Sequence, residues 1–196
     1  MSALARLVSI VFSPLVILLL TPYLLVEKVS NNPLYSLKWA LVSYVFIFAV
    51  VIFIFLGVIF GIFSNFDVSK QKERPMLFSF VGLITFFYLL SLLIFKGPKI
   101  LFVTVFAVLL GLIAISIVNK KVKASVHVAV ISAFMLIIAI LYKGPYLLSL
   151  MLVPIIGWSR VKTKKHTVLE VILGAILGGL LTFVVYFIGK LYFFKP

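Results

Sequence analysis

Most residues of this chain that could do chemistry fall in three short polar segments, residues 64–76, 119–127 and 159–170. Both histidines and three of the four acidic residues lie in these segments. An ionisable side chain beside lipid is energetically costly, so such residues tend to be kept where they act. The search for a functional site therefore begins in these three segments.

The third segment predicts an oriented nucleophile. His166 precedes Glu170 by four residues, which places both side chains on one face of a helix, where the carboxylate can accept an imidazole N–H. The other ring nitrogen can then attack an electrophile. Arg160 has a planar fork of donors suited to phosphate oxygens, and the start of a helix adds free N–H groups. The alternative is a basic loop that binds anionic lipid headgroups.

The second segment adds a second histidine at the start of another predicted helix. Ser125 is a suitable N-cap, and a phosphate at this helix start would meet backbone N–H groups and the ammonium of Lys123. His127 could act as the general acid that protonates a leaving oxygen. The alternative is an ordinary hydrogen-bonded histidine at the membrane boundary.

The first segment ends in a proline that is well placed to begin a helix, Pro75. Arg74 could bind a phosphate there, with Lys70 or Lys72 as a further cation. A solvated run of charges explains this segment equally well.

Together, the segments resemble the signature motifs of the type 2 phosphatidic acid phosphatase superfamily, the membrane relatives of bacterial acid phosphatases and vanadium haloperoxidases. The resemblance covers about residues 67–178. The family's third motif is Ser-Arg, five residues, His, three residues, Asp. Here it consists of Ser159, Arg160 and His166, with Glu170 in the position of the Asp.

The other two motifs are kept in part. The second, Pro-Ser-Gly-His, is met at Ser125 and His127, whereas Ala and Val replace its Pro and Gly. The first, Lys, six residues, Arg-Pro, keeps Arg74 and Pro75 but has Asp67 in the position of the Lys.

The resemblance implies a role for each matching residue. His166 would attack phosphorus to form a phosphohistidine, Glu170 would orient it, and His127 would protonate the leaving group. The implied phosphate-binding residues are Arg160, Arg74, Ser125, Lys123, Ser159 and, in place of the missing lysine, Lys70 or Lys72. Fixed cations and helix-start amides can stabilise a transferring phosphoryl group, so we expect neither a metal nor a cofactor.

The composition places these segments in a membrane protein. Of 196 residues, 65% are apolar and 11% are charged, and the mean hydropathy is +1.35, which excludes a water-soluble globule. A helix needs about 20 apolar residues to cross a bilayer. This length predicts spans at residues 7–25, 39–63, 77–95, 100–118 and 168–193, and hence an all-α polytopic transmembrane helix bundle.

A further apolar stretch, residues 128–157, is interrupted by Lys143, Gly144 and Pro145. The interruption predicts two short helices joined by a tight turn, the second ending near Pro154. This interpretation gives seven spans and puts the three polar segments, and so the active site, at one face of the membrane. The alternative is one continuous span, which gives six and separates the third segment from the others.

The short loops predict a single domain over residues 1–196, with a motif-bearing core at about 64–193. Within the last span, Gly174 and Gly178 lie four residues apart and would let a neighbouring helix approach closely.

The expected partners are lipids. A net charge of +14 on so apolar a chain must face phosphate-bearing headgroups, and no segment is long and polar enough to bind nucleic acid. We therefore predict a membrane lipid phosphatase that hydrolyses a phosphomonoester or diphosphate, such as phosphatidic acid, phosphatidylglycerol phosphate or a polyprenyl diphosphate. The alternatives are a lipid phosphotransferase and a non-catalytic lipid-binding or transport subunit. Orientation in the membrane and oligomeric state stay open.

Overall fold

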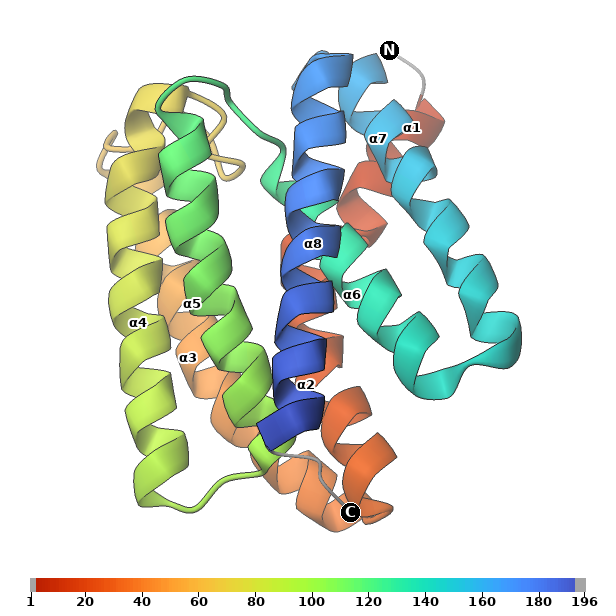
Figure 1. Ribbon diagram of the computed structural model, residues 1–196. Coiled ribbons are helices and arrows are strands. Elements are labelled where there is room, and N and C mark those ends of the chain that lie inside the picture. Colours follow the sequence, from red (N-terminus) through yellow and green to blue (C-terminus); the bar gives the residue numbers. More distant parts are fainter. Residues whose placement is uncertain (1–2, 193–196) are drawn as a thin grey trace. The chain divides into compact units, whose positions relative to one another are not determined.

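The computed structural model describes residues 3–192, and every long element in this part of the chain is a helix (Figure 1). The elements in chain order are α1 (Ala3–Val11), α2 (Pro14–Ser30), α3 (Pro33–Ile59), the short 3-10 helix η1 (Gln71–Glu73), α4 (Arg74–Ile94), α5 (Lys99–Asn119), α6 (Val126–Tyr142), the 3-10 helix η2 (Gly144–Met151), α7 (Leu152–Lys162) and α8 (Val168–Tyr192). The predicted end of the last span, Phe193, lies outside the described residues.

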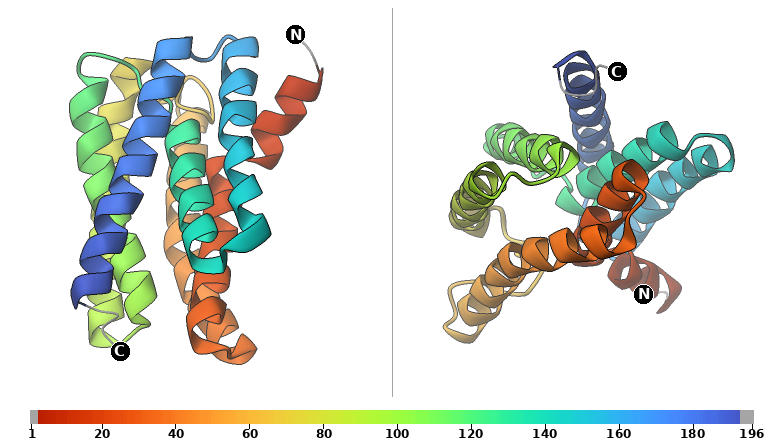
Figure 2. Two further views of the ribbon diagram at one scale, coloured as in Figure 1. Left: turned by 45° about the vertical axis from the view of Figure 1, so that its right-hand side comes forward. Right: turned by 90° about the horizontal axis from the view of Figure 1, so that it is seen from below.

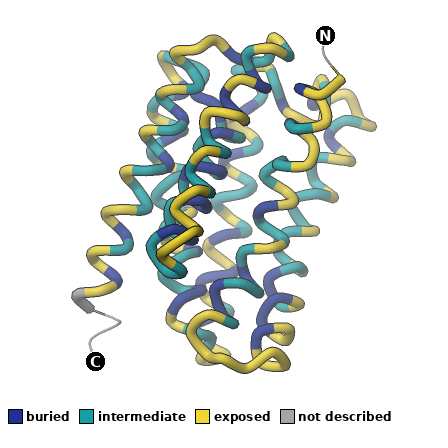
Figure 3. The backbone as a smooth tube through the Cα atoms, turned by 90° about the vertical axis from the view of Figure 1, so that its right-hand side faces the viewer, coloured by how far each residue is buried: buried dark blue, intermediate teal, exposed yellow. Residues whose placement is uncertain are grey.

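Six helical segments among the described residues are long and apolar enough to cross a membrane. They are Ala3–Ser30, Pro33–Ile59, Gln71–Ile94, Lys99–Asn119, Gly144–Lys162 and Val168–Lys190. Large apolar side chains such as Leu34 and Ile94 are exposed on these helices, and exposed stretches run along much of the chain (Figure 3). Such surfaces are typical of helices that face lipid. The prediction of an all-α polytopic bundle is confirmed, and the chain is an integral multi-pass membrane protein.

The chain forms two compact units, which are described separately. The first comprises residues 1–21 and 117–196 and contains α1, α6, α7 and α8. The second comprises residues 22–116 and contains α3 and α4. The second and third polar segments lie in the first unit, and the first polar segment lies in the second. That the chain is a single domain stays a prediction.

The predicted break in the stretch from 128 to 157 is confirmed. The chain reverses direction after α6, so that η2 and α7 return alongside it (Figures 1 and 2). Lys143 and Gly144 both have positive φ, 57° and 53°, a conformation that ends the helix. One continuous helix over this stretch is therefore wrong. Helix α6 is apolar but, with 17 residues, shorter than the six segments named above, so the count of seven spans stays a prediction. The predicted end near Pro154 is also wrong, because the second helix continues to Lys162 and a proline is tolerated in the first turn of a helix.

Helices α6 and α8 lie side by side and touch through small residues, as predicted for Gly174 and Gly178 (Figure 2). A Cβ atom on Gly174 would lie 2.5 Å from the backbone oxygen of Ser125, and one on Gly178 would lie 2.1 Å from that of Ala129. Glycine is therefore required at both positions for the helices to approach this closely. The contact fixes the start of α6 against the first turns of α8.

In the second unit, α4 packs on α3 through aromatic side chains. Phe53 and Phe80 stack with ring centroids 3.8 Å apart, and Phe46 stacks on Tyr88 at 4.6 Å. The hydroxyl of Tyr88 is also hydrogen-bonded to that of Ser43. A buried hydroxyl pair of this kind satisfies both polar groups inside the apolar span.

Candidate active site

His166 lies in a short connection whose shape is set by the end of α7. The N–H of Lys164 donates to the carbonyl of Val161 at 3.0 Å, and the N–H of Lys165 donates to that of Arg160 at 3.1 Å. These two bonds form a Schellman motif, which turns the chain back over the end of the helix. Lys164 has φ 57°, the left-handed conformation that this motif requires. The turn brings the N–H of His166 to 3.3 Å from the carbonyl of Arg160.

The residue after His166 begins α8 with a capping box. The hydroxyl of Thr167 accepts from the N–H of Glu170 at 3.3 Å, and the Glu170 carboxylate accepts from the N–H of Thr167 at 3.3 Å. The four-residue spacing predicts that His166 and Glu170 share one face of a helix. This prediction is wrong, because His166 lies before the start of α8. The two side chains meet because the capping box turns the carboxylate back toward the residues before the helix.

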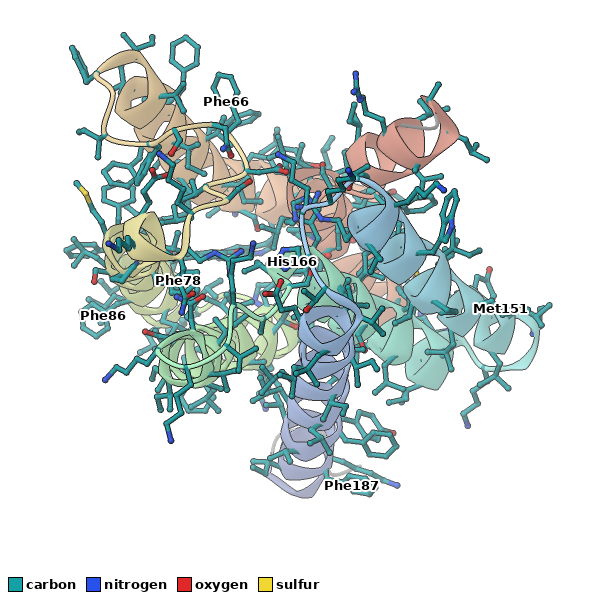
Figure 4. The ribbon with its side chains drawn as sticks, turned by 90° about the horizontal axis from the view of Figure 1, so that it is seen from above. Phe66, Phe78, Phe86, Met151, His166 and Phe187 are labelled. Carbon is teal, nitrogen blue, oxygen red and sulfur yellow. The ribbon has the colours of Figure 1, made fainter. Side chains whose placement is uncertain are left out.

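The predicted contact between His166 and Glu170 is present. Imidazole Nδ1 lies 2.7 Å from Oε2 of Glu170, and His166 is only 8% exposed. Figure 4 shows His166 at the connection between α7 and α8. When Nδ1–H donates to the carboxylate, a neutral imidazole carries its lone pair on Nε2. This tautomer is the one that a nucleophilic or basic histidine needs.

The second polar segment docks on this connection. The N–H of Ser125 donates to the backbone carbonyl of Glu170 at 3.0 Å. The ammonium of Lys123 donates to the carbonyl of Lys165 at 2.9 Å and lies 4.0 Å from the Glu170 carboxylate. The structure thus brings together four of the predicted site residues, Lys123, Ser125, His166 and Glu170.

Ser125 is the N-cap of α6, as predicted, but its hydroxyl makes no capping bond. The side chain is fully buried, and Oγ has no hydrogen-bond partner among the described residues. Buried hydroxyls in proteins are nearly always paired, so an unpaired one beside the first N–H groups of a helix is suited to an anionic ligand. His127 is the second residue of the same helix and is half-buried.

Arg160 and Ser159 lie in the last turn of α7 and are buried, 3% and 0% exposed. Nη1 of Arg160 donates to the hydroxyl of Ser9 at 2.7 Å, and the hydroxyl of Ser159 donates to the carbonyl of Ala5 at 2.7 Å. The hydroxyl proton of Ser159 is engaged by the carbonyl of Ala5, so Ser159 connects α7 to α1. That Ser159 also binds a phosphate stays a prediction. The sequence predicts one span over residues 7–25, whereas the structure divides this region into α1 and α2 and packs α1 against α7. The one sequence signal for this contact is a pair of small residues four apart, Ala5 and Ser9.

The first polar segment belongs to the second unit. Arg74 is the first residue of α4 and is 4% exposed, and its Nε donates to the carbonyl of Val68 at 3.4 Å. Pro75 lies in the first turn of α4, as predicted. Nζ of Lys70 lies 3.6 Å from Oε1 of Glu73, with a largely exposed side chain. That Arg74 and Lys70 converge with the other segments stays a prediction.

Comparisons with known proteins add no further constraint. No family model, curated protein or solved structure matches this chain. Within residues 3–192, no three His, Asp or Glu side chains are grouped closely enough to hold a metal ion. The interpretation of the site therefore depends on the geometry around His166.

Proposed function

We propose that this protein is a membrane lipid phosphatase of the type 2 phosphatidic acid phosphatase kind, working through a phosphohistidine. The observation that carries the proposal is the 2.7 Å contact of His166 Nδ1 with Glu170. It lies in the same unit as a buried arginine and beside an unpaired serine hydroxyl at the start of α6. The combination supplies an oriented nucleophile and donors for the oxygens of a phosphate.

In the first step, Nε2 of His166 attacks phosphorus. The N–P bond forms as the P–O bond to the lipid breaks, and His127 gives its proton to the departing oxygen. Glu170 stabilises the positive charge that develops on the imidazole by accepting its Nδ1–H. In the second step, His127 takes a proton from water, the water oxygen attacks phosphorus, and the N–P bond breaks to release inorganic phosphate and the original His166.

Charge on the transferring group is stabilised by groups fixed in place before the reaction. Lys123 and Arg160 provide positive charge, and the start of α6 provides N–H donors beside Ser125. Such prepositioned dipoles and cations supply most of the catalysis in phosphoryl transfer. The proposed chemistry is complete without a metal ion.

Lipid is the favoured substrate class because the site adjoins apolar surface. Trp158 on α7 and Val168 and Leu169 at the start of α8 are exposed, at 44%, 60% and 59%. An acyl or prenyl tail could lie against these side chains while its headgroup enters the site. We place the protein in the cell or cytoplasmic membrane; the face that carries the site is left open.

The test is phosphate release from a panel of lipid monophosphates and diphosphates, with protein purified in detergent. His166→Ala should reduce turnover to background, and radiolabelled substrate should leave an acid-labile label on the wild-type protein only. Lys164→Gly is the matched control, because it changes the same loop, keeps the left-handed conformation and removes one exposed cation. Equal turnover by His166→Ala and wild type would overturn the proposal.

The same panel separates the two alternatives. A lipid phosphotransferase would form the labelled histidine but release phosphate only to an added lipid acceptor. A binding or transport subunit would show neither label nor release, and His166→Ala would leave its lipid binding unchanged.

A further inference from the structure

Helix α1 is joined to the helix that carries Arg160 by two buried hydrogen bonds. Ser159 Oγ donates to the carbonyl of Ala5, and Arg160 Nη1 donates to Oγ of Ser9, both at 2.7 Å. All four residues are buried, at 9% exposure or less. The bonded residues lie about 150 positions apart in the sequence, so these contacts form only when the chain folds.

The face of α1 that meets α7 differs from the rest of the helix. It presents the small residues Ala5 and Ser9, whereas Leu4, Leu7 and Ile10 are exposed. Small side chains let two helices approach closely. An alanine at position 9 would meet that packing need as well, so the hydroxyl of Ser9 has to be explained by what it binds.

The hydroxyl binds a guanidinium without cancelling its charge. Burying an arginine is costly unless its N–H groups are hydrogen-bonded. A carboxylate partner would satisfy them but would neutralise the cation, which lowers its attraction for a phosphate. A serine oxygen accepts one N–H and fixes the direction of the planar group without adding a negative charge of its own.

We propose that Ser9 is a positioning residue for Arg160, and that α1 thereby completes the phosphate-binding site. This inference depends on the proposed function. The group that Arg160 would bind is the phosphoryl group, so the effect of Ser9 should be the same for lipids with different tails. The hydroxyl acts through Arg160 and does not touch the reacting atoms.

The experiment compares Ser9→Ala, Ser9→Thr and Ser9→Asp in the full-length protein. Ser13→Ala is the matched control, since Ser13 lies in the same part of the chain and its hydroxyl makes only a 3.5 Å contact with an exposed N–H. Three quantities are measured: kcat and KM on phosphatidic acid, the inhibition constant of inorganic phosphate, and the unfolding temperature in detergent.

The expected pattern follows from hydrogen bonding and charge. A hydrogen bond to a charged group contributes enough to change a rate by roughly 10-fold to 100-fold, so Ser9→Ala should lower kcat/KM and weaken phosphate inhibition by that range. Ser9→Thr keeps the hydroxyl and should stay within about threefold of wild type. Ser9→Asp should hold Arg160 at least as firmly yet weaken phosphate inhibition more than Ser9→Ala.

A purely structural role for Ser9 gives the opposite order. In that case Ser9→Asp, with its ion pair, would keep wild-type phosphate inhibition, and activity would follow the unfolding temperature alone. That result, or a Ser9→Ala protein as active as Ser13→Ala while Arg160→Ala is inactive, would overturn the inference and leave the phosphatase intact. If Ser9→Ala does not fold, the comparison of Ser9→Asp with Ser9→Thr decides. Wild-type protein without phosphate release overturns the proposed function and this inference together.

Discussion

Replacing Gly174 by alanine tests whether the close contact of α6 with α8 positions the site. The added Cβ would lie 2.5 Å from the backbone oxygen of Ser125, whereas ordinary contacts begin at 3.4 Å. The start of α6 must therefore move away from α8 by about 1 Å. Because the obstructing atom belongs to the backbone, no side-chain rotation relieves the clash.

The expected loss has two parts. Overpacking of this kind lowers the free energy of unfolding by about 1–3 kcal/mol. A displacement of about 1 Å between catalytic groups can lower a rate by about 100-fold, and here it separates Ser125 and His127 from His166 and Glu170. We expect both losses in Gly174→Ala, measured as unfolding temperature in detergent and as kcat/KM for phosphate release.

Gly179 provides the matched control in the same helix. A Cβ there would lie 3.5 Å from the hydroxyl of Ser132, an ordinary contact. Gly179→Ala should be neutral or more stable, because alanine favours a helix over glycine by about 1 kcal/mol. If Gly174→Ala proved as stable and as active as Gly179→Ala, the packing argument would be refuted.

Three further predictions concern the chemistry. Glu170→Gln should lower kcat by about 100-fold or more, since a neutral amide stabilises the charged imidazole much less than a carboxylate does; an unchanged kcat would exclude Glu170 as the orienting group. His127→Ala should lower kcat by about 100-fold to 10,000-fold on a lipid phosphate, and by much less on an aryl phosphate whose leaving group needs no proton; equal losses on both would argue against a general acid. Treatment with a chelator should leave phosphate release unchanged, and activity that is lost with chelator and restored by magnesium would contradict the metal-free mechanism.

The features that sequence predicts well here are local ones. The spacing of Arg160, His166 and Glu170 is meaningful because two helix-end motifs of fixed length, a Schellman motif and a capping box, lie between them. The shared helical face that the spacing of His166 and Glu170 predicts is nevertheless wrong. A four-residue interval across a helix start and one within a helix cannot be told apart until the first helical residue is known.

The features that sequence misses depend on distant contacts. The contact of Ser9 with Arg160 joins α1 to α7, and no local pattern encodes which helix a small residue will meet. The sequence predicts a helix end near Pro154, and this is wrong because a proline can lie near either end of a helix, depending on what precedes it. The preceding 3-10 turns of η2 make it part of a helix start.

One oxygen atom of Glu170 links the imidazole of His166 to the start of α8. Oε2 receives both the imidazole of His166, at 2.7 Å, and the first N–H of the capping box, at 3.3 Å. The imidazole of His166, a residue of the loop before α8, is thereby also held to the start of α8. A change in bilayer thickness that tilts α8 would move the imidazole with the helix. The thickness of the membrane would then affect how fast the nucleophile reacts.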